Sequence, residues 1–438
     1  MNATASRVDV ASRRPPSADA VPRLLAGVAT NGPLSIDAHL DRYGELPLPR
    51  LRRPDFGLIE LVEASGLLGR GGAAFPTGTK LRAVAAAGRR PFVVVNGAEG
   101  ELLSGKDEAL LRHVPQLVLD GAAVAAAAVG AREVTIVVGT GPAVSVLDAA
   151  IDARSHRRLD RVSFQLAIAP DGFVVGEETA LVHWLNGGPA KPTFTPPRPF
   201  ERGVRGAPTL VQNVETLANL ALIARFGSDW FRGLGRKHEP GTALVTLGGA
   251  VARPGVYEIP LGLPLSELIA WAGGSTEPLA AFLIGGYFGT WVAADRAITL
   301  RLLDSELRSL GATLGARAIF ALPTRTCGLV ETARVGRYLA DESAGQCGPC
   351  VHGLDAIASA LAELAWGGRD PATSVSRIER WLEQIRGRGA CRHPDGAVRM
   401  IQSGLAVFAD ERARHARGTC SGDRRPALPL PWSAAARR

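Results

Sequence analysis

Between residues 55 and 141 the sequence alternates between two kinds of apolar pattern, and this alternation constrains the fold more than any other feature. Residues 56–65 (FGLIELVEAS) have helical spacing, and residues 91–100 (PFVVVNGAEG) begin with the run of a buried strand. Residues 117–131 (LVLDGAAVAAAAVGA) are again helical, and residues 132–141 (REVTIVVGTG) contain a second strand. Helices that alternate with strands are typical of a parallel sheet. The sequence therefore predicts an α/β domain over residues 51–235.

Two further domains are predicted after the α/β domain. Residues 243–274 contain short strand patterns, broken by ARPG and PLGLP and followed by one helix, which indicates a small β-grasp-like module over residues 240–325. The apolar residues of the final third have helical spacing and predict a bundle over residues 328–412. They include Ile378, Trp381, Leu382 and Ile385 at positions i, i+3, i+4 and i+7.

The two ends of the chain have a different character. Residues 1–50 are rich in Pro, Arg and Ala without sustained periodicity, and indicate a poorly ordered leader. Residues 413–438 form a basic tail, which is more typical of a solvated end than of an arm that docks nucleic acid or an acidic partner.

Composition favours a cytoplasmic protein. Residues 1–27 have no long apolar core after their basic residues, so no secretory signal is predicted. The most apolar run, residues 121–131, is too short to span a membrane and is bounded by Asp120 and Arg132. In the cytoplasm, five cysteines that include a C-x2-C pair favour metal or redox chemistry over disulfides.

Residues 65–81 (SGLLGRGGAAFPTGTKL) are rich in glycine and carry the cations Arg70 and Lys80. Gly69, Gly71 and Ala74 satisfy the spacing G-x-G-x-x-A of a dinucleotide-binding fingerprint. That fingerprint follows a strand and opens a helix, whereas here a helical segment precedes it and FPTG follows. The pattern indicates either a loop whose N–H groups and cations hold a phosphate or an ordinary tight loop.

Three other loops carry polar side chains at predicted strand ends, where ligands bind in open α/β sheets. Carboxylates and amides suit the polar edge of a flavin ring, and the glycine-rich loop with Lys80 suits its phosphate. The loops are residues 93–107 with Asn96, Glu99, Glu101, Lys106 and Asp107; residues 171–185 with Gly176, Glu177 and Glu178; and residues 205–220 with Gln212, Asn213 and Thr216.

These motifs, in this order, resemble the flavin-carrying, NADH-oxidising subunit of respiratory NADH:quinone oxidoreductase and its relatives in hydrogenases and formate dehydrogenases. The family pattern G-R-G-G-A-G-F-P-T-G-x-K is matched from Gly69 to Lys80, except that Ala74 replaces a glycine. GEETAL and PTLVQNVETLAN match with one substitution, Gln212 for asparagine. The resemblance covers about residues 55–410. It likens the middle module to an SLBB domain and the final third to an iron–sulfur-binding domain.

The resemblance implies the site residues and the chemistry. Hydride would pass from NADH to FMN, and single electrons would then pass to an iron–sulfur cluster. The partners implied are ferredoxin or other iron–sulfur electron-transfer subunits, with no nucleic acid and no direct membrane insertion. FMN contacts are implied for Gly69, Arg70, Gly72, Lys80, Asn96, Glu99, Gly176, Glu177, Asn213 and Thr216, and nicotinamide contacts for Phe75, Glu101 and Glu178.

One cluster ligand is missing from the pattern. The family motif S-C-G-x-C-x-P-C, with a fourth cysteine about forty residues later, is matched here by Cys347, Cys350 and Cys391, but its first cysteine is Ala344. A 4Fe–4S cluster usually takes four thiolates. The resemblance therefore implies a cluster with one protein ligand missing at Ala344, and the alternative is that the cluster is lost.

Two other departures concern the activity. The family carries K-P-P-F before its NNVET segment, whereas Thr195, Pro196, Pro197 and Arg198 stand here, which implies weaker NADH binding. The loop NGAEGE resembles instead the related Rnf C subunit, with Ala98 where the respiratory enzyme has an acidic residue. The alternatives to NADH oxidation are thus an Rnf C-like electron-transfer subunit without efficient NADH oxidation and a degenerate, non-catalytic SLBB scaffold.

Overall fold

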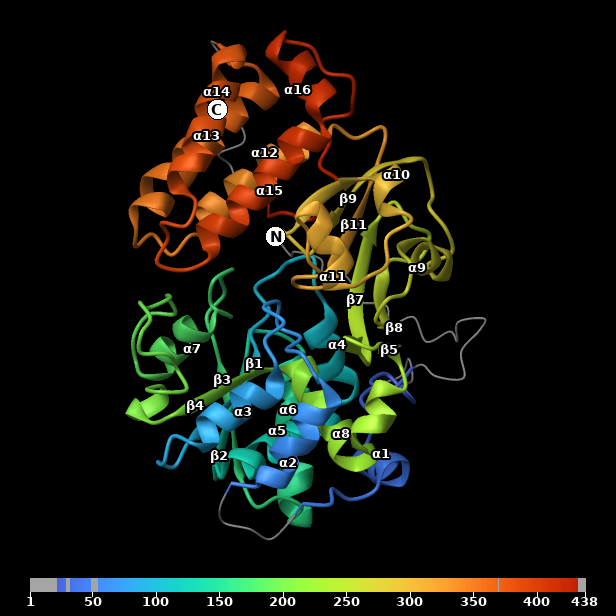
Figure 1. The fold of residues 1–438 in the computed structure, drawn as a ribbon, viewed down its shortest axis with the longest axis vertical. Helices are drawn as coiled ribbons and strands as arrows, with labels where there is room; N and C mark the ends of the chain where they lie inside the picture. Colours follow the sequence, from blue (N-terminus) through green and yellow to red (C-terminus); the bar gives the residue numbers. More distant parts are fainter. Residues whose placement is uncertain (1–21, 29–31, 49–53, 369, 432–438) are drawn as a thin grey trace. The chain divides into compact units, whose positions relative to one another are not determined.

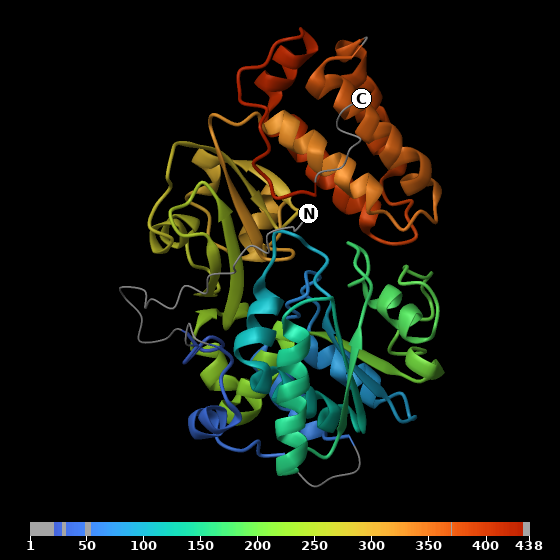
Figure 2. The same ribbon diagram turned by 180° about the vertical axis from the view of Figure 1, so that it is seen from behind.

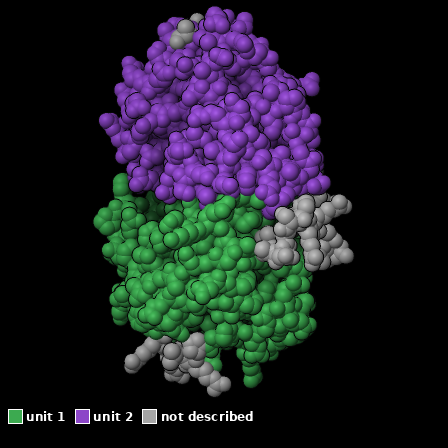
Figure 3. All heavy atoms as spheres, turned by 45° about the vertical axis from the view of Figure 1, so that its right-hand side comes forward, with its two compact units in different colours: residues 1–100, 104–246, 255–263 green, residues 101–103, 247–254, 264–438 purple. Residues whose placement is uncertain are grey.

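The computed structural model describes residues 22–28, 32–48, 54–368 and 370–431. They form two compact units, which Figure 3 shows in different colours. Unit 1 comprises Met1–Gly100, Ser104–Thr246 and Gly255–Leu263, and unit 2 comprises Glu101–Leu103, Leu247–Pro254 and Pro264–Arg438. None of the described helices is both long and apolar enough to cross a membrane. The predicted boundaries of the separate domains stay a prediction.

Unit 1 is built on a four-stranded parallel sheet with the strand order β3-β2-β1-β4 (Figure 1). Val93 and Val95 of β1 belong to one apolar core, whereas Val94 belongs to another, so both faces of this strand are buried. This explains its unbroken apolar run and confirms the predicted α/β fold. The strands are β1 Phe92–Gly97, β2 Glu133–Val138, β3 Ser163–Ile168 and β4 Thr209–Asn213.

Helices cover both faces of this sheet. The largest helix–helix contact joins α5 and α8, and it depends on small residues: a Cβ on Gly121 of α5 would lie 1.8 Å from the carbonyl oxygen of Leu217 in α8. The alanine-rich run is therefore a closely packed core helix. The helices are α1 Ile36–Tyr43, α2 Phe56–Ser65, α3 Thr77–Ala85, α4 Lys106–His113, α5 Pro115–Val129, α6 Ala143–Arg157, α7 Glu178–Leu185 and α8 Val214–Arg232.

The described part of the predicted leader is ordered, which corrects the expectation for residues 22–28 and 32–48. Helix α1 lies in this stretch, and Leu24 is fully buried. The backbone N–H groups of residues 23, 24 and 25 donate to Oε2 of Glu258 at 2.8, 2.8 and 3.1 Å. The leader is held by a carboxylate more than 230 residues away in sequence, which no local pattern reveals. Residues 1–21 lie outside the described residues.

The middle of the chain forms a second sheet with the strand order β10-β9-β11-β7-β8. The strands are β7 Thr242–Gly249, β8 Gly255–Pro260, β9 Leu279–Ile284, β10 Thr290–Ala293 and β11 Ala318–Pro323. A two-stranded ribbon, β5 Gly235–Arg236 and β6 Glu239–Pro240, precedes them. The short helices are α9 Leu265–Trp271, α10 Ala294–Ala297 and α11 Asp304–Leu307.

The last part of unit 2 is a group of helices, as predicted, and can be followed from both sides in Figures 1 and 2. Helix α12 packs against α13 and α15, and α13 packs against α14. The apolar stripe that includes Ile378 and Leu382 is buried. The helices are α12 Gly328–Asp341, α13 Asp355–Trp366, α14 Pro371–Ile385, α15 His393–Val407 and α16 Ala409–Ala416, and a π-helical turn, η3 Pro349–Leu354, leads into α13.

The described part of the basic tail, up to residue 431, packs on this helical group, which corrects the expectation of a solvated end. Leu428 is buried, and its backbone N–H and that of Ala427 each donate to the Glu331 carboxylate at 3.1 Å. Thr326 forms a parallel bridge with Asp423. Net charge alone suggested a solvated tail, but a few apolar and backbone contacts hold it in place.

Candidate functional site

The glycine-rich loop lies against the N-terminus of α8, at the carboxyl end of β4. The backbone N–H of Arg70 donates to Oγ1 of Thr216 at 2.8 Å. A Cβ on Gly71 would lie 3.2 Å from Cβ of Asn213, the N-cap of α8. Gly72 has a φ of +110°, which favours glycine. The loop therefore passes at close range along a helix terminus, whose N–H groups and dipole favour an anion.

The side chain of Arg70 turns into the protein. Its Nη2 atom donates to the carbonyl oxygen of Thr242 at 3.1 Å, its Nε atom lies 3.8 Å from Oε1 of Glu215, and the residue is 1% exposed. The guanidinium therefore stabilises the glycine-rich loop through contacts with the protein interior. Contact between Arg70 and a flavin stays a prediction, and the geometry favours a positioning role.

The predicted phosphate cation and one predicted nucleotide carboxylate lie together. Nζ of Lys80, in α3, donates to Oε2 of Glu178, in the first turn of α7, at 2.7 Å. The two side chains are 22% and 32% exposed. Because the pair is accessible, a bound phosphate can compete with Glu178 for the ammonium group.

A second contact joins the end of β1 to the loop before α7. Nδ2 of Asn96 donates to the carbonyl oxygen of Gly176 at 2.8 Å. A Cβ on Gly176 would lie 2.3 Å from the carbonyl oxygen of Ala98, so only glycine fits. Glu177 caps α7 by accepting from the N–H groups of residues 179 and 180 at 2.9 and 3.0 Å, and burial raises the pKa of its carboxyl. These three predicted residues shape the edge of the site.

A buried charged network lies beyond β1 and β4. Nζ of Lys106 donates to Oδ1 of Asp107 at 2.6 Å and lies 3.4 Å from Oε2 of Glu215. Nδ2 of Asn213 donates to Oδ2 of Asp107 at 2.6 Å, and the backbone N–H of Asp107 donates to Oε2 of Glu99 at 3.3 Å. The network thus connects two predicted flavin contacts, Asn213 and Glu99, through Asp107, which the sequence placed in the same polar loop but which was not assigned a flavin contact.

The network sets the protonation of its members. Burial raises the pKa of Glu99 to about 8, and the charge of Asp107 adds to this, whereas Lys106 opposes it. Burial lowers the pKa of Lys106, but the carboxylates of Asp107, Glu215 and Glu99 outweigh it, and the net pKa is raised. The carboxylates thus favour the charged form of Lys106, while burial and the charge of Asp107 favour the protonated form of Glu99.

Two other predicted nucleotide contacts occupy different settings. Phe75 is 52% exposed, so its ring is accessible for stacking. Glu101 belongs to unit 2, where Oε2 accepts from the backbone N–H of Tyr287 at 2.6 Å and Oε1 accepts from that of Leu103 at 3.1 Å. Burial raises the pKa of Glu101 to about 7, although both N–H groups lower it.

The cysteines of the predicted cluster motif gather around η3. Burial raises the pKa of Cys350 to about 12, and the nearby thiols of Cys347 and Cys391 raise it further. Ala344, at the position of the missing ligand, is buried, and Gly345 beside it has a φ of +65°.

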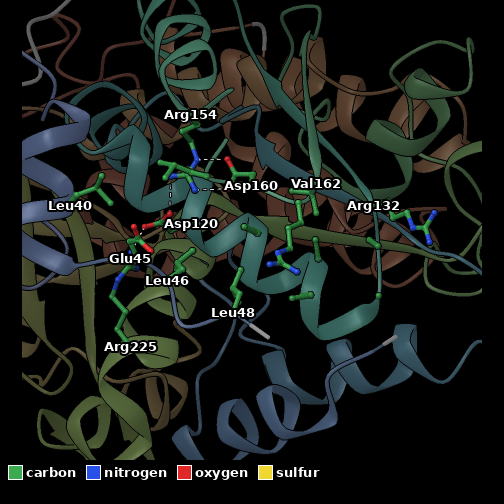
Figure 4. A pocket seen from close by; sticks show the side chains of 17 residues that line it. Leu40, Glu45, Leu46, Leu48, Asp120, Arg132, Arg154, Asp160, Val162 and Arg225 are labelled. Atoms are coloured by element: carbon green, nitrogen blue, oxygen red, sulfur yellow. Dashed lines mark hydrogen bonds and ion pairs between the residues drawn. The ribbon is translucent and has the colours of Figure 1, made fainter. Parts of the chain in front are cut away.

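One pocket of unit 1 lies away from these residues (Figure 4). It is at the amino ends of the strands, because its lining includes Arg132, which precedes β2, and Val162, which precedes β3. Asp120 in its wall pairs with Arg154 at 2.8 Å and with Arg225 at 2.6 Å. None of the predicted site residues lines this pocket, and its paired charges hold α5, α6 and α8 together.

The sequence did not indicate a second group of potential ligands. Cys327, Glu411, His415 and Cys420 each offer a ligand atom, and these atoms all lie within 4.8 Å of one another. The Glu411–His415 spacing of i, i+4 on a helix was a possible signal. The two cysteines are far apart in the sequence, however, and only the folded chain brings them together.

A parallel-sheet unit with a glycine-rich anion loop, followed by a helical region with clustered cysteines, defines an electron-transfer subunit of the flavin and iron–sulfur class. Three family models match in the same order: the Nuo51 FMN-binding domain over residues 62–222, the SLBB domain over residues 244–286, and the NADH-ubiquinone oxidoreductase-F iron-sulfur binding region over residues 331–415. The chain belongs to the family of the F subunit of NADH-quinone oxidoreductase.

Named relatives support this membership. The F subunit of NADH-quinone oxidoreductase in Mycobacterium tuberculosis is 33% identical over 401 residues, which cover 86% of this chain and 89% of the relative. The F 2 subunit of the Rhizobium meliloti enzyme is 32% identical, with 82% and 88% covered. A chain of an NAD+-reducing NiFe-hydrogenase in the air-oxidized state superimposes with a TM-score of 0.79 at 28% identity, over 90% of this chain and 67% of that one. In the H2-reduced state the TM-score is 0.75 at 29% identity, and the match spans 82% of this chain and 62% of the hydrogenase chain.

Proposed function

We propose that this chain oxidises NADH through FMN and passes electrons through an iron–sulfur cluster to ferredoxin or to another iron–sulfur subunit of a larger complex. One observation carries the proposal: four predicted segments meet at the carboxyl edge of one parallel sheet. The glycine-rich loop bonds to Thr216, Lys80 pairs with Glu178, and Asn96 bonds to Gly176. This meeting of the family's motifs at one edge of the sheet supports the proposal.

The residues at this edge fit FMN. The glycine loop leaves room for close approach to its backbone, and Lys80 offers an accessible cation for a phosphate. Nε2 of Gln212, at the end of β4, is buried with no hydrogen-bond partner among the described residues, so it offers a donor to a ligand oxygen. When bound, FMN accepts a hydride and releases its electrons one at a time.

The protein side chains would bind and orient FMN and the nucleotide. Lys80 and the loop N–H groups would hold the phosphate, while Asn96, Glu99, Glu177 and Asn213 would hold the polar edge of the ring. Burial raises the pKa of Glu99 to about 8, which favours a protonated carboxyl that would donate a hydrogen bond. Phe75 would stack against the nucleotide and Glu178 would orient its ribose hydroxyls or carboxamide, a role that the family resemblance also implies for Glu101.

The helical region fits a cluster with three protein thiolates. Cys347, Cys350 and Cys391 would supply the ligands, and the place of the fourth ligand would be left to water, hydroxide or a ligand from elsewhere, because Ala344 stands where the motif has its first cysteine. Cys327 is not that ligand, because it precedes α12 whereas Ala344 follows it. The 14 residues of α12 span about 21 Å.

The test is a visible spectrum of anaerobically purified protein, with flavin and iron counted per chain, followed by anaerobic titration with NADH. We expect bound FMN, iron in excess of one atom per chain, and bleaching of the flavin by NADH. Flavin that dithionite bleaches but millimolar NADH does not would favour the Rnf C-like alternative. A colourless protein without flavin or iron would overturn the proposal and leave only the scaffold.

A further inference from the structure

We propose that Cys327, Glu411, His415 and Cys420 form a structural zinc site, separate from the three-cysteine motif. All four lie in unit 2. Cys327 is the N-cap residue of α12, Glu411 and His415 are one turn apart on α16, and Cys420 follows that helix. Two thiolates, one imidazole and one carboxylate are ligands that Zn²⁺ takes in tetrahedral sites.

Three of the distances between the ligand atoms are close to those that a tetrahedral ion requires. Zinc–ligand bonds are about 2.3 Å to sulfur and about 2.0–2.2 Å to nitrogen or oxygen. In a tetrahedron such bonds place sulfur about 3.6 Å from nitrogen or oxygen, and nitrogen about 3.4 Å from oxygen. Sγ of Cys327 lies 3.4 Å from Nε2 of His415 and 3.9 Å from Oε1 of Glu411. Nε2 of His415 lies 3.2 Å from that same carboxylate oxygen.

The groups around the ligands orient them as in metal sites. Nδ1 of His415 lies 3.2 Å from the carbonyl oxygen of Leu364, so Nδ1–H can donate there and leave Nε2 as the ligand atom. The backbone N–H of Ser421 donates to Oε1 of Glu411 at 2.9 Å. Arg414, whose Nη1 lies 3.2 Å from Oε2 of Glu411, offsets the net negative charge of a zinc ion with three anionic ligands.

Burial favours a metal over a loose group of polar side chains. Cys327 and His415 are each 2% exposed, and the Glu411 side chain is 12% exposed. Cys420 is more accessible and provides a route of entry. With four protein ligands no position is left for a catalytic water. The ion would therefore hold the segment after α16 against the start of α12, where the N–H of Cys327 donates to the carbonyl oxygen of Asp423 at 2.9 Å.

The test is the zinc content of the full-length protein, purified from zinc-supplemented medium without chelators, in four forms: unmodified, Cys420→Ser, His415→Gln and Cys391→Ser. The last removes a cysteine of the three-cysteine motif and is the matched control. We expect about one zinc ion per chain in the unmodified and Cys391→Ser proteins, and at least a roughly fivefold loss in the other two.

Cobalt keeps the proposal testable if a variant fails to fold. Cys391→Ser protein produced with Co²⁺ should show the intense visible absorption of tetrahedral cobalt and thiolate-to-cobalt charge transfer. Equal zinc in all four forms, absence of zinc and of the cobalt spectrum, or a Cys327–Cys420 disulfide in the mass of the unreduced protein would each overturn the site. A disulfide would mean that the two cysteines are a redox pair. Absence of zinc and of the cobalt spectrum would mean that the group is a His–Glu ion pair beside two thiols.

Discussion

At the scale of single residues, Lys80 is the side chain on which flavin binding depends most directly. It is one of only four lysines in the chain, it is partly exposed, and its partner Glu178 is also accessible. A charge-assisted hydrogen bond to a phosphate is worth about 1.5–3 kcal/mol. Lys80→Ala should therefore weaken FMN binding at least about tenfold, as measured by fluorescence titration of the flavin-free protein.

Two variants separate this role from general damage. Lys191→Ala removes an exposed lysine outside the site and should leave FMN affinity unchanged. Glu178→Gln releases Lys80 from its 2.7 Å ion pair, so FMN should bind as tightly as before or more tightly, while reduction by NADH slows. Unchanged affinity in Lys80→Ala would remove Lys80 from the phosphate site.

Glu101 gives a prediction about pH and stability. Its pKa is raised from 4.5 to about 7, chiefly by burial. A raised folded-state pKa stabilises the protein while the group is protonated. This contribution is complete below about pH 4.5 and is lost as pH rises through about 7, and it amounts to at most about 3 kcal/mol. Glu101→Gln should reduce the fall in the free energy of unfolding between pH 5 and pH 7.5, as measured by urea unfolding at both pH values. The exposed Glu383→Gln should retain it, and equal slopes in all three proteins would contradict the prediction.

At the scale of helices and strands, the sequence predicted what depends on neighbouring residues. The buried strand β1, the parallel sheet and the helical stripe through Ile378 follow from local apolar patterns. The inward orientation of the Arg70 side chain could not be predicted from the sequence, because its partners Thr242 and Glu215 lie in distant elements. The order in the leader, which depends on Glu258, was missed for the same reason.

The cluster motif is an element-scale feature, because a π-helical turn and two loops position its cysteines. If three thiolates hold a cluster, Ala344→Cys should raise iron per chain and lengthen the half-life of the visible absorbance in air several-fold, since a fourth thiolate closes the site. Ala344 is buried where the motif places its first cysteine. Cys350→Ala should abolish iron binding.

A cysteine outside the motif is the control for this experiment. Cys420→Ser should leave iron content unchanged, because Cys420 belongs to the group at the other end of α12. Equal and negligible iron in the unmodified, Ala344→Cys and Cys350→Ala proteins would mean that the cluster is lost and the helical region is structural.

At the scale of the whole molecule, we expect the two departures at Thr195 and Arg198 to weaken the binding of NADH. The family resemblance places a lysine and an aromatic ring at these positions, and both side chains are exposed here. Loss of an aromatic stacking partner costs about 0.5–1.5 kcal/mol, and loss of a cationic contact about as much again. Because a planar guanidinium also stacks on aromatic rings, we expect Arg198 to offset part of this loss. We therefore expect NADH to reduce the bound flavin, with an affinity roughly ten- to a hundredfold below that of typical family members.

Restoring the two side chains tests this expectation directly. The double variant Thr195→Lys and Arg198→Phe should tighten NADH binding at least about fivefold in an anaerobic titration that follows flavin bleaching, because each new group regains about 0.5–1.5 kcal/mol. Both positions are exposed, and the bond from the backbone N–H of Arg198 to Glu201 at 2.7 Å does not depend on the side chain, so the fold should tolerate the change. Arg202→Phe, which adds an aromatic ring at an exposed position outside the altered segment, should have no such effect. Rapid bleaching of the unmodified protein at low micromolar NADH would show that Phe75, Glu178 and the exposed Phe194 suffice for a complete nucleotide site.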